Sequence, residues 1–561
     1  MVDQFARQKF YVKYSLKTDL GTFALFTAPY ADGDQYSIVY RSPQCFAIAI
    51  GNFWRDGKFG EAALEGLLDQ RGHDQAYDQL EGEFSILIRN GNELKLWTDV
   101  LNLNKIYRNS QAIYSSSWLA AAGSNPTIEL EQSAAQEYII YGASHGQETP
   151  IKQVTLMHPG QFIYNFQKAD VIPYISTPSY EANQPTSLSG AIDVLADMLV
   201  KKFELIKNAF PNRVRSALSS GFDSRMILAG LHHVGNRPSL VVYGKDNDVD
   251  VLIARQIADG ESLDLTVTDK SLSNAIVNKT AENDLDAACS FFDGIPVDGF
   301  IDSGIDQKTR LEQNANSHIS LNGGGGEIFR NFFYLRDNRF SASDLFDTFY
   351  SQCDARLFGK KNLAAEFRER FVNHIAQAAF GVNPTTNQKI DRNQIERLYA
   401  TFRCKYWMGR NNTVANRYGA FLTPLLDPKY LNVTANLPLS WKYAGKLQSG
   451  IITALSPTIA AYPSSYGFSF SEGPSINAQV NEYFTRAKPT WLRPMPSIVR
   501  ARLRPIKSVS AKIADDYRQR FGILVDEDFG LQLAHFGNPA QLNRAASLNY
   551  AMRWLKSSQR I

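Results

Sequence analysis

The hydrophobic pattern of this chain changes period near residue 180, and this change constrains the fold more than any other feature. Upstream, short runs rich in β-branched and aromatic residues, among them 46–54 and 83–90, predict strands. Downstream, segment 191–210 has the apolar spacing of a helix, and 238–244 predicts a strand before the helical run 250–260. Strands that alternate with helices favour a parallel sheet covered by helices on both faces.

The length of the chain, 561 residues, exceeds that of an ordinary single domain, so the change of pattern predicts a domain boundary. A polar stretch with two prolines, residues 176–190, predicts a linker. We therefore expect one domain over residues 1–175 and a second over 191–561, in which the part beyond residue 340 is mostly helical.

Composition argues against several classes of protein. Apolar residues make up 44% and charged residues 20%, which is enough for a large core and excludes global disorder. The net charge of +3 is lower than that of a general nucleic-acid binder, so no specific nucleic-acid partner is expected. The four cysteines form no CxxC pair, which argues against a cysteine zinc site. Neither a signal-type N-terminus nor an apolar run of membrane-spanning length is present, so the expected location is the cytoplasm.

Between a predicted strand and a predicted helix lies a loop of small residues, Leu218-Ser219-Ser220-Gly221-Phe222-Asp223-Ser224. Open parallel sheets bind ligands beyond the carboxyl ends of their strands, and such a loop presents backbone N–H groups to an anion. The serines add hydroxyl donors, and Asp223 can hold the Mg²⁺ that accompanies a phosphate. The pattern fits a phosphate-binding loop, or else a plain turn whose Ser or Asp caps the helix.

The stretch SALSSGFDSRMILAG around this loop resembles the pyrophosphate loop S-G-G-x-D-S of the asparagine synthetase superfamily, which includes β-lactam synthetases and lasso-peptide cyclases. Other resemblances follow in the family's order, at VVYGKDNDVDVLIARQIAD, LNGGGGEIFRNFF and FLTPLLDPKYLNVTANLP. Upstream, LEGEFSILIRN, TDVLNLNKIY and YSSS resemble its glutaminase-type domain, so the resemblance covers most of residues 40–470. It implies an Ntn-type α/β sandwich followed by a parallel-sheet, Rossmann-like ATP-pyrophosphatase domain with a helical C-terminal part.

The resemblance implies an ATP- and Mg²⁺-dependent ligase that activates a small-molecule or peptide carboxylate as an acyl-adenylate. Ammonia or a substrate amine would then attack it. Asp223 and Glu327 would bind the metal, and the catalytic candidates are Glu327, Arg225 and Lys446. The residues expected to bind the nucleotide are Leu218, Ser219, Ser220, Gly221, Asp223, Ser224, Tyr243, Gly244, Gly324 and Gly325.

The chain departs from the family at the glutaminase. That reaction needs an N-terminal cysteine, whose thiolate attacks the glutamine amide. This chain begins with Met1 and Val2, and its first cysteine, Cys45, lies within an apolar run that predicts burial. We therefore expect the sandwich to be a structural domain without glutaminase activity.

The second loop departs as well. Laid on the family's G-E-G-x-D-E, it reads Asn322-Gly323-Gly324-Gly325-Gly326-Glu327, so only the last carboxylate remains. Glu327 is either a metal ligand or base, or a cap of the following helix near its positive end. The family's late lysine has no counterpart near 463–467, and Lys442 and Lys446 are the nearest candidates. Arg225 can bind a phosphate or carboxylate, or else form a surface salt bridge.

Segment 486–520 is locally basic. It fits contact with an anionic membrane surface or an acidic partner, or alternatively a solvated helical face. The oligomeric state stays open. Two alternatives to the ligase also stay open: a non-catalytic relative that binds a nucleotide or a partner, and a base-modifying enzyme that acts on RNA.

Overall fold

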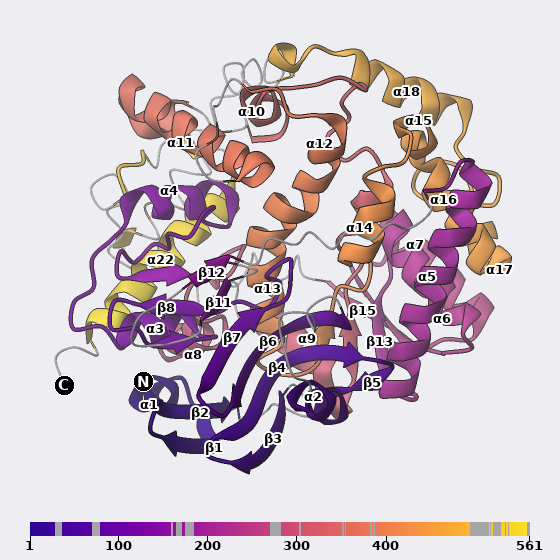
Figure 1. Ribbon diagram of the computed structural model, residues 1–561. Coiled ribbons are helices and arrows are strands. Elements are labelled where there is room, and N and C mark those ends of the chain that lie inside the picture. The colour runs from indigo at the N-terminus through magenta and orange to yellow at the C-terminus, as the bar shows by residue number, and fades with distance from the viewer. Residues whose placement is uncertain are drawn as a thin grey trace.

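Two kinds of sheet organise the computed structural model, which is a mixed α/β structure: antiparallel sheets from the first part of the chain and a five-stranded parallel sheet from the second (Figure 1). The structure describes residues 1–28, 36–69, 79–158, 161–163, 171–173, 184–269, 282–301, 305–350, 353, 355–381, 384, 388–493, 515, 518–519, 529–532, 535–536 and 538–557.

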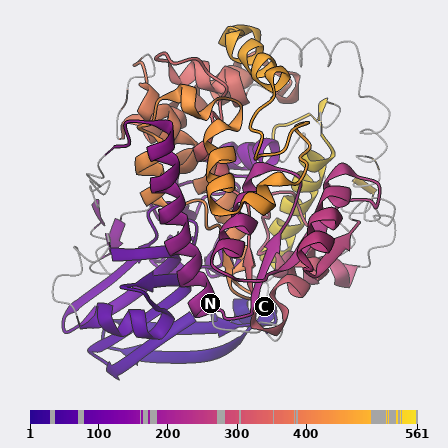
Figure 2. The same cartoon turned by 90° about the vertical axis from the view of Figure 1, so that its right-hand side faces the viewer.

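Up to residue 175, the elements are α1 (Val2–Arg7), β1 (Tyr11–Thr18), β2 (Gly21–Thr27), β3 (Tyr36–Ser42), β4 (Cys45–Arg55), β5 (Lys58–Phe59), α2 (Gly60–Leu68), β6 (Leu80–Asn90), β7 (Glu93–Thr98), β8 (Tyr107–Asn109), β9 (Tyr114–Ser115), α3 (Trp118–Gly123), α4 (Gln132–Tyr141), β10 (Val154–Leu156), β11 (Gln161–Ile163) and β12 (Val171–Pro173). The main antiparallel sheet has the order β12-β11-β7-β6-β4-β3, with β5 paired to β4. Strands β4 and β6 confirm the two strands predicted at 46–54 and 83–90. Figure 2 shows this sheet at the lower left of the molecule.

The parallel sheet and the elements around it comprise α5 (Leu188–Ala209), β13 (Val214–Ala217), α6 (Phe222–His233), β14 (Ser239–Tyr243), α7 (Val249–Glu261), β15 (Leu265–Thr268), α8 (Glu282–Phe291), α9 (Ile305–Asn314), β16 (Ile319–Leu321), η6 (Gly326–Phe329) and β17 (Phe421–Leu422). Its strand order is β15-β14-β13-β16-β17, and every pairing is parallel. The chain runs outward from β13 to β15 and then returns to add β16 on the other side of β13. The strand order therefore reverses between β13 and β16, and ligands of open α/β sheets bind at such a reversal.

The remainder is mainly helical, as the sequence predicts: α10 (Ala342–Leu345), η7 (Phe346–Tyr350), η8 (Ala355–Phe358), α11 (Lys361–Phe380), α12 (Arg392–Leu398), η9 (Tyr399–Met408), α13 (Gly409–Ala415), α14 (Pro428–Thr434), α15 (Leu439–Lys442), α16 (Lys446–Leu455), α17 (Pro457–Ala461), α18 (Ile476–Ala487), η11 (Thr490–Leu492) and α22 (Pro539–Ser557). Two of these elements, η7 and η9, are π-helical. In the part of the chain that is described, no helix combines the length and apolar character needed to cross a membrane.

The predicted linker, 176–190, is corrected at its end. Helix α5 already begins at Leu188, because the hydroxyl of Ser187 accepts a hydrogen bond from Gly190 N and caps the helix. Residues 188–190 are therefore helical, whereas residues 174–183 lie outside the described part of the chain.

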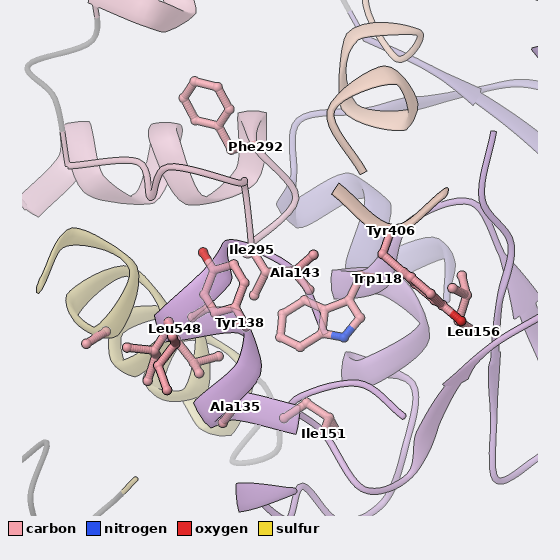
Figure 3. Close-up of a cluster of buried hydrophobic side chains, with 14 of the residues drawn as sticks. Trp118, Ala135, Tyr138, Ala143, Ile151, Leu156, Phe292, Ile295, Tyr406 and Leu548 are labelled. Carbon is pink, nitrogen blue, oxygen red and sulfur yellow. The ribbon is translucent and has the colours of Figure 1, made fainter. Parts of the chain in front are cut away.

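The largest hydrophobic core joins segments that are far apart in the sequence. Trp118 and Tyr138, on α3 and α4, pack in one cluster with Phe292, Tyr406 and Leu548 (Figure 3). Helix α22 also returns to the N-terminal helix, where the Arg7 guanidinium lies 3.6 Å from the centroid of the Trp554 ring. The first 175 residues thus share a core with the C-terminal helix.

Ion pairs also connect the main antiparallel sheet to helices α5 and α14. Glu81 on β6 binds Lys202 of α5, with 2.7 Å between Oε2 and Nζ, and also binds Lys429 of α14. Although burial alone would raise it, the pKa of Glu81 is lowered by these two ammonium groups to about 2. The folded state therefore gains stability from the ionised carboxylate above a pH of about 4.5, and loses it as the pH falls toward 2.

We expect Glu81→Gln to lower the free energy of unfolding at pH 7 by up to about 3 kcal/mol, since one unit of pKa corresponds to about 1.4 kcal/mol. The difference from the unchanged protein should shrink as the pH is lowered from 5 to 3. Urea denaturation at several pH values measures this. Glu129→Gln is the control, because its side chain is 58% exposed. Equal pH dependence in both variants would contradict the role of Glu81.

Candidate active site

Two loops meet where the strand order of the parallel sheet reverses. The loop that ends at Gly221 follows β13, and the loop that starts at Asn322 follows β16. Because β13 and β16 are parallel neighbours, their carboxyl ends lie at the same edge. The structure therefore brings together the two loops that the sequence singled out.

Asp223 and Glu327 share one cation, the guanidinium of Arg330. The Nη2 atom of Arg330 lies 3.2 and 3.3 Å from the two carboxylate oxygens of Asp223, and 3.8 Å from Oε1 of Glu327. Gln448 on α16 donates from Nε2 to Oδ1 of Asp223 at 2.8 Å and to the carbonyl of Gly326 at 3.0 Å. The side chains of Asp223 and Arg330 are each 19% exposed, and that of Glu327 is 29% exposed. This cluster is therefore sheltered but remains open to small ligands.

Burial raises the pKa of Asp223 to about 6, against the attraction of Arg330 and with a further increase from the charge of Glu327. Burial would lower the pKa of Arg330, but Asp223 and Glu327 together hold it above its ordinary value. The guanidinium is thus firmly charged. It offsets part of the repulsion between the two carboxylates.

Glu327 makes its contacts through side chains. Besides Arg330, its carboxylate accepts a hydrogen bond from the Tyr399 hydroxyl. Glu327 is the second residue of η6, which is a single four-residue turn. Tyr399 and Arg330 therefore hold the Glu327 carboxylate at the edge of the second loop.

Crowding explains the glycines of the second loop. A Cβ atom on Gly326 would lie 2.3 Å from Oδ1 of Asp223, and one on Gly323 would lie 3.1 Å from the backbone nitrogen of Ser224. Gly325 adopts a φ of +88°, which favours glycine. The Asp223 side chain thus fills the space that a side chain at position 326 would need.

Internal hydrogen bonds hold the first loop. The Ser224 hydroxyl accepts from Ser219 N at 2.9 Å, and Gly221 N donates to the Ser219 hydroxyl at 3.2 Å. Ser220 donates through its backbone N–H, at 2.9 Å, and through its hydroxyl to the carboxylate of Asp250 on α7. Asp250 therefore already accepts hydrogen bonds from the N–H and hydroxyl groups of Ser220, which are donors of the kind that bind phosphate oxygens. Gly221 is the N-cap of α6 and has no side chain to cap it, so the helix N-terminus remains available to an anion.

Three further predicted nucleotide-binding residues lie on the sheet or its edge. Leu218, directly after β13, is buried and donates its N–H to the carbonyl of Val241 at 2.8 Å. Tyr243 ends the neighbouring strand β14 and is 37% exposed. A Cβ on Gly244 would lie 2.9 Å from Oδ2 of Asp248, so a side chain there would collide with the start of α7. The fourth, Gly324, lies in the second loop, where a Cβ would lie 2.4 Å from Cε of Met408.

Two predicted catalytic residues lie apart from the carboxylate cluster. Arg225 is fully buried, and its guanidinium donates to the carbonyls of Ile459, Tyr462 and Pro463. We therefore assign Arg225 to holding the end of α17 in place of the predicted ligand contact. Lys446 begins α16 and lines a separate pocket.

The other lysine candidate is also occupied. Lys442 is buried, and its ammonium group forms an ion pair with Glu396 on α12. Burial lowers the pKa of Lys442 well below its ordinary value. Lys442 therefore belongs to the packing between α15 and α12.

The donor set of the cluster suits a hard divalent cation. Asp223 and Glu327 converge on one positive charge, and Oε1 of Gln448 is buried with no hydrogen-bond partner. Mg²⁺ favours oxygen ligands and commonly takes one or two carboxylates together with phosphates and water. Within the described residues, no set of three or more His, Cys, Asp or Glu side chains is arranged to hold a metal. The cluster would therefore share a cation with the ligand it serves.

A cavity of about 880 Å³ opens beside the cluster. Glu327 and Arg330 form part of its wall. Four of the other ten lining residues are aromatic, namely Phe332, Phe333, Tyr334 and Phe349. The cluster therefore borders a space large enough for a small-molecule ligand.

Sequence reasoning missed Arg330, Gln448 and Tyr399 as site residues. Arg330 carries a weak signal, because a residue three positions after Glu327 lies on the same side of a helical turn. Gln448 and Tyr399 reach the cluster through the folding of distant helices, and the sequence around them carries no signal of that contact.

The basic segment 486–520 is described over 486–493, 515 and 518–519 only. Arg486 lies 3.4 Å above the ring of Tyr443, and Arg493 donates to the carbonyls of Phe333 and Tyr334. These two basic side chains therefore make contacts within the protein. The rest of the proposed contact surface, between 494 and 514, lies outside the described residues.

Neither a scan against models of known protein families nor a search among curated proteins returns a match to this sequence.

Proposed function

We propose that this chain is an ATP-dependent, AMP-forming carbon–nitrogen ligase that resembles the asparagine synthetase superfamily, with an Ntn-type sandwich joined to a Rossmann-like ATP-pyrophosphatase domain. The observation that carries the proposal is the meeting of loops 218–224 and 322–327 at the reversal of the parallel sheet, where Asp223 and Glu327 share the charge of Arg330. Such an edge is the ordinary ligand site of an open α/β sheet.

The reaction has two steps. In the first, a carboxylate oxygen of the substrate acid attacks the α-phosphorus of ATP, the bond from that phosphorus to the bridging oxygen breaks, and pyrophosphate leaves. In the second, the nitrogen of an amine attacks the carbonyl carbon, the bond to the AMP oxygen breaks, and the amine loses a proton. The products are an amide, AMP and pyrophosphate.

The first loop provides the pyrophosphate contacts. The hydroxyls of Ser219, Ser220 and Ser224 and the uncapped N-terminus of α6 offer donors to phosphate oxygens. Asp250 holds Ser220 in place until a phosphate competes for it. Gly323 lets the second loop approach the first, and Gly244 allows the turn after β14.

The charged side chains of the cluster would assist the first step, the attack of the substrate carboxylate on ATP. Asp223 and Glu327 are the residues that would hold Mg²⁺. That ion, when bound, neutralises charge on the phosphates. Arg330, in contact with both carboxylates, would pair with phosphate oxygens of the nucleotide. Glu327, held by Tyr399, would serve either as the second metal ligand or as the base that accepts the proton of the attacking amine.

Glutamine is not expected to supply the nitrogen. The first cysteine of the sequence, Cys45, is half-buried at the start of β4 and not fully buried as predicted, and as an internal residue it has no free α-amine to act as the base. We expect the purified protein to release no glutamate from glutamine in a coupled glutamate dehydrogenase assay. Glutamate release that disappears in Cys45→Ala would contradict this. Ammonia or a substrate amine would serve instead.

Exchange of labelled pyrophosphate into ATP, dependent on an added acid, tests the proposed activity. We expect Glu327→Gln to preserve folding but to lower this exchange by at least about tenfold, which corresponds to about 1.4 kcal/mol. Glu312→Gln is the matched control, because that side chain is 56% exposed and belongs to α9. Full exchange in Glu327→Gln with a lowered thermal midpoint would assign Glu327 to stability alone.

A second function, a nucleotide-binding protein without catalysis, is favoured by one observation. The guanidinium of Arg330 already neutralises part of the charge of Asp223 and Glu327, so the cluster has a counterion without a metal. Mg-ATP binding by calorimetry, with no pyrophosphate exchange for any acid tested, would support this function over the ligase.

A further inference from the structure

We infer that the acid activated by this protein carries an aromatic or otherwise apolar body, and that this body occupies the cavity beside Glu327. The inference rests on the proposed function, because it names the class of acid that the same site would activate. It is carried by the shape, the wall and the charge of the cavity of about 880 Å³.

Four of the twelve residues in the wall of the cavity are aromatic, and three of them pack together. Phe332 packs against Phe333 and Phe349, with ring centroids 4.9 and 4.8 Å apart. It also contacts the ring of Tyr399 at 4.3 Å, and the Tyr399 hydroxyl binds Glu327. A continuous series of ring contacts therefore connects the wall of the cavity to the carboxylate cluster. Apolar rings of a ligand gain free energy by leaving water for such a surface.

The turn that shapes the cavity is held in a strained conformation. Tyr334 has a φ of +49°, which bulky residues rarely adopt, and its side chain is 43% exposed. One guanidinium, that of Arg493, donates to the carbonyls of Phe333 and Tyr334 at 2.8 and 2.6 Å and thereby fixes this turn. Strained residues held by surrounding contacts are typical of ligand sites.

The charges around the cavity favour an anion. Its wall contains three basic residues, Arg330, Lys488 and Arg493, and one acidic residue, Glu327. Arg493 is engaged with backbone carbonyls, whereas Lys488 is exposed at the wall. A carboxylate on the ligand would thus find Arg330 at the inner end, beside the first loop.

The cavity is larger than an amino acid such as aspartate requires. Sites for small molecules usually enclose about 300–1,000 Å³, and this cavity lies in the upper part of that range. A small polar acid would leave most of the aromatic wall in contact with water. A two-ring acid or a short peptide with aromatic side chains would cover it.

The experiment measures binding without chemistry. The full chain is loaded with Mg²⁺ and α,β-methylene-ATP, and calorimetry follows the addition of 2-naphthylacetate, N-acetyl-Phe-Phe or aspartate. We expect at least one of the two aromatic acids to bind at least about tenfold more tightly than aspartate, because burial of its rings adds to the charge contact. Tighter binding of naphthylacetate indicates a small-molecule acid, and tighter binding of the dipeptide indicates a peptide.

Two variants locate the binding. Tyr334→Asn removes the ring and introduces a residue that tolerates a positive φ, so the variant should fold. Its affinity for the aromatic acid should fall by about fivefold. Tyr40→Asn removes an exposed tyrosine from β3, 48% exposed, and should leave binding unchanged. Aspartate that binds as tightly as the aromatic acids, or Tyr334→Asn without effect, would overturn the inference. Loading with the nucleotide is measured first, so its failure would count against the proposed function and not against the class of acid.

Discussion

Asp223→Asn is expected to lower acid-dependent pyrophosphate exchange by at least about a hundredfold, which corresponds to about 2.7 kcal/mol of transition-state stabilisation. Asp223 lies at the contact between the two loops, and its carboxylate touches Arg330 and Gln448. Asn has nearly the same size as Asp but no charge. The change therefore removes the negative oxygen that would bind the Mg²⁺ accompanying the phosphates. Pyrophosphate exchange at fixed Mg²⁺ measures the loss.

The same substitution on the surface provides the control. Asp246 lies in the turn before α7, is 87% exposed and pairs with Arg255. The Asp246→Asn variant should therefore show unchanged pyrophosphate exchange. Calorimetry then separates binding from chemistry, because Asp223→Asn should also weaken Mg-ATP. Unchanged affinity for Mg-ATP together with unchanged exchange would refute the assignment of the loop.

The parts of this site that the sequence predicts are those that local chemistry determines. The loop 218–224 joins a strand to a helix, and both elements have apolar periods that can be read within a few residues. Alternation of strands and helices then implies parallel pairing, which places loops 218–224 and 322–327 at one edge. No knowledge of distant contacts is needed for this step.

The parts that the sequence does not predict depend on distant contacts. Gln448 contacts Asp223 across 225 positions, and only the packing of α16 onto α6 brings them together. Arg225 looks like a phosphate ligand in the sequence, yet in the fold it donates to the carbonyl of Ile459 in α17 and to that of Pro463 just beyond it. The strand β17 has only two residues, so it carries no readable period and is recognised only by its pairing with β16.

A large effect on stability is expected from Asp293→Asn. Asp293 follows α8 and is fully buried, where it accepts hydrogen bonds from Trp118 N at 2.8 Å and from Arg410 Nη1 at 2.9 Å. Arg417 lies 3.4 Å from the same carboxylate. One side chain thus joins the start of α3, in the first part of the chain, to helix α13 and the turn after it.

Loss of this charge leaves two buried guanidinium groups without their counterion, and breaking a buried ion pair usually costs about 3–5 kcal/mol. We expect Asp293→Asn to lower the free energy of unfolding by about 3 kcal/mol. Asn suits the positive φ of this position, 55°, so backbone strain is not the cause. Urea denaturation at pH 7 measures the change, and Asp298→Asn, 73% exposed, is the matched control.

The pH dependence provides the decisive test. Burial alone would raise the pKa of Asp293, but Arg417 and Arg410 together hold it below its ordinary value. The ionised group therefore stabilises the fold above a pH of about 4, and this contribution disappears as the pH falls below that value. The difference between Asp293→Asn and the unchanged protein should accordingly narrow in acid. A loss of stability that stays constant from pH 7 to pH 3 would point to altered packing around Trp118 as its origin, and would exclude the buried charge pair.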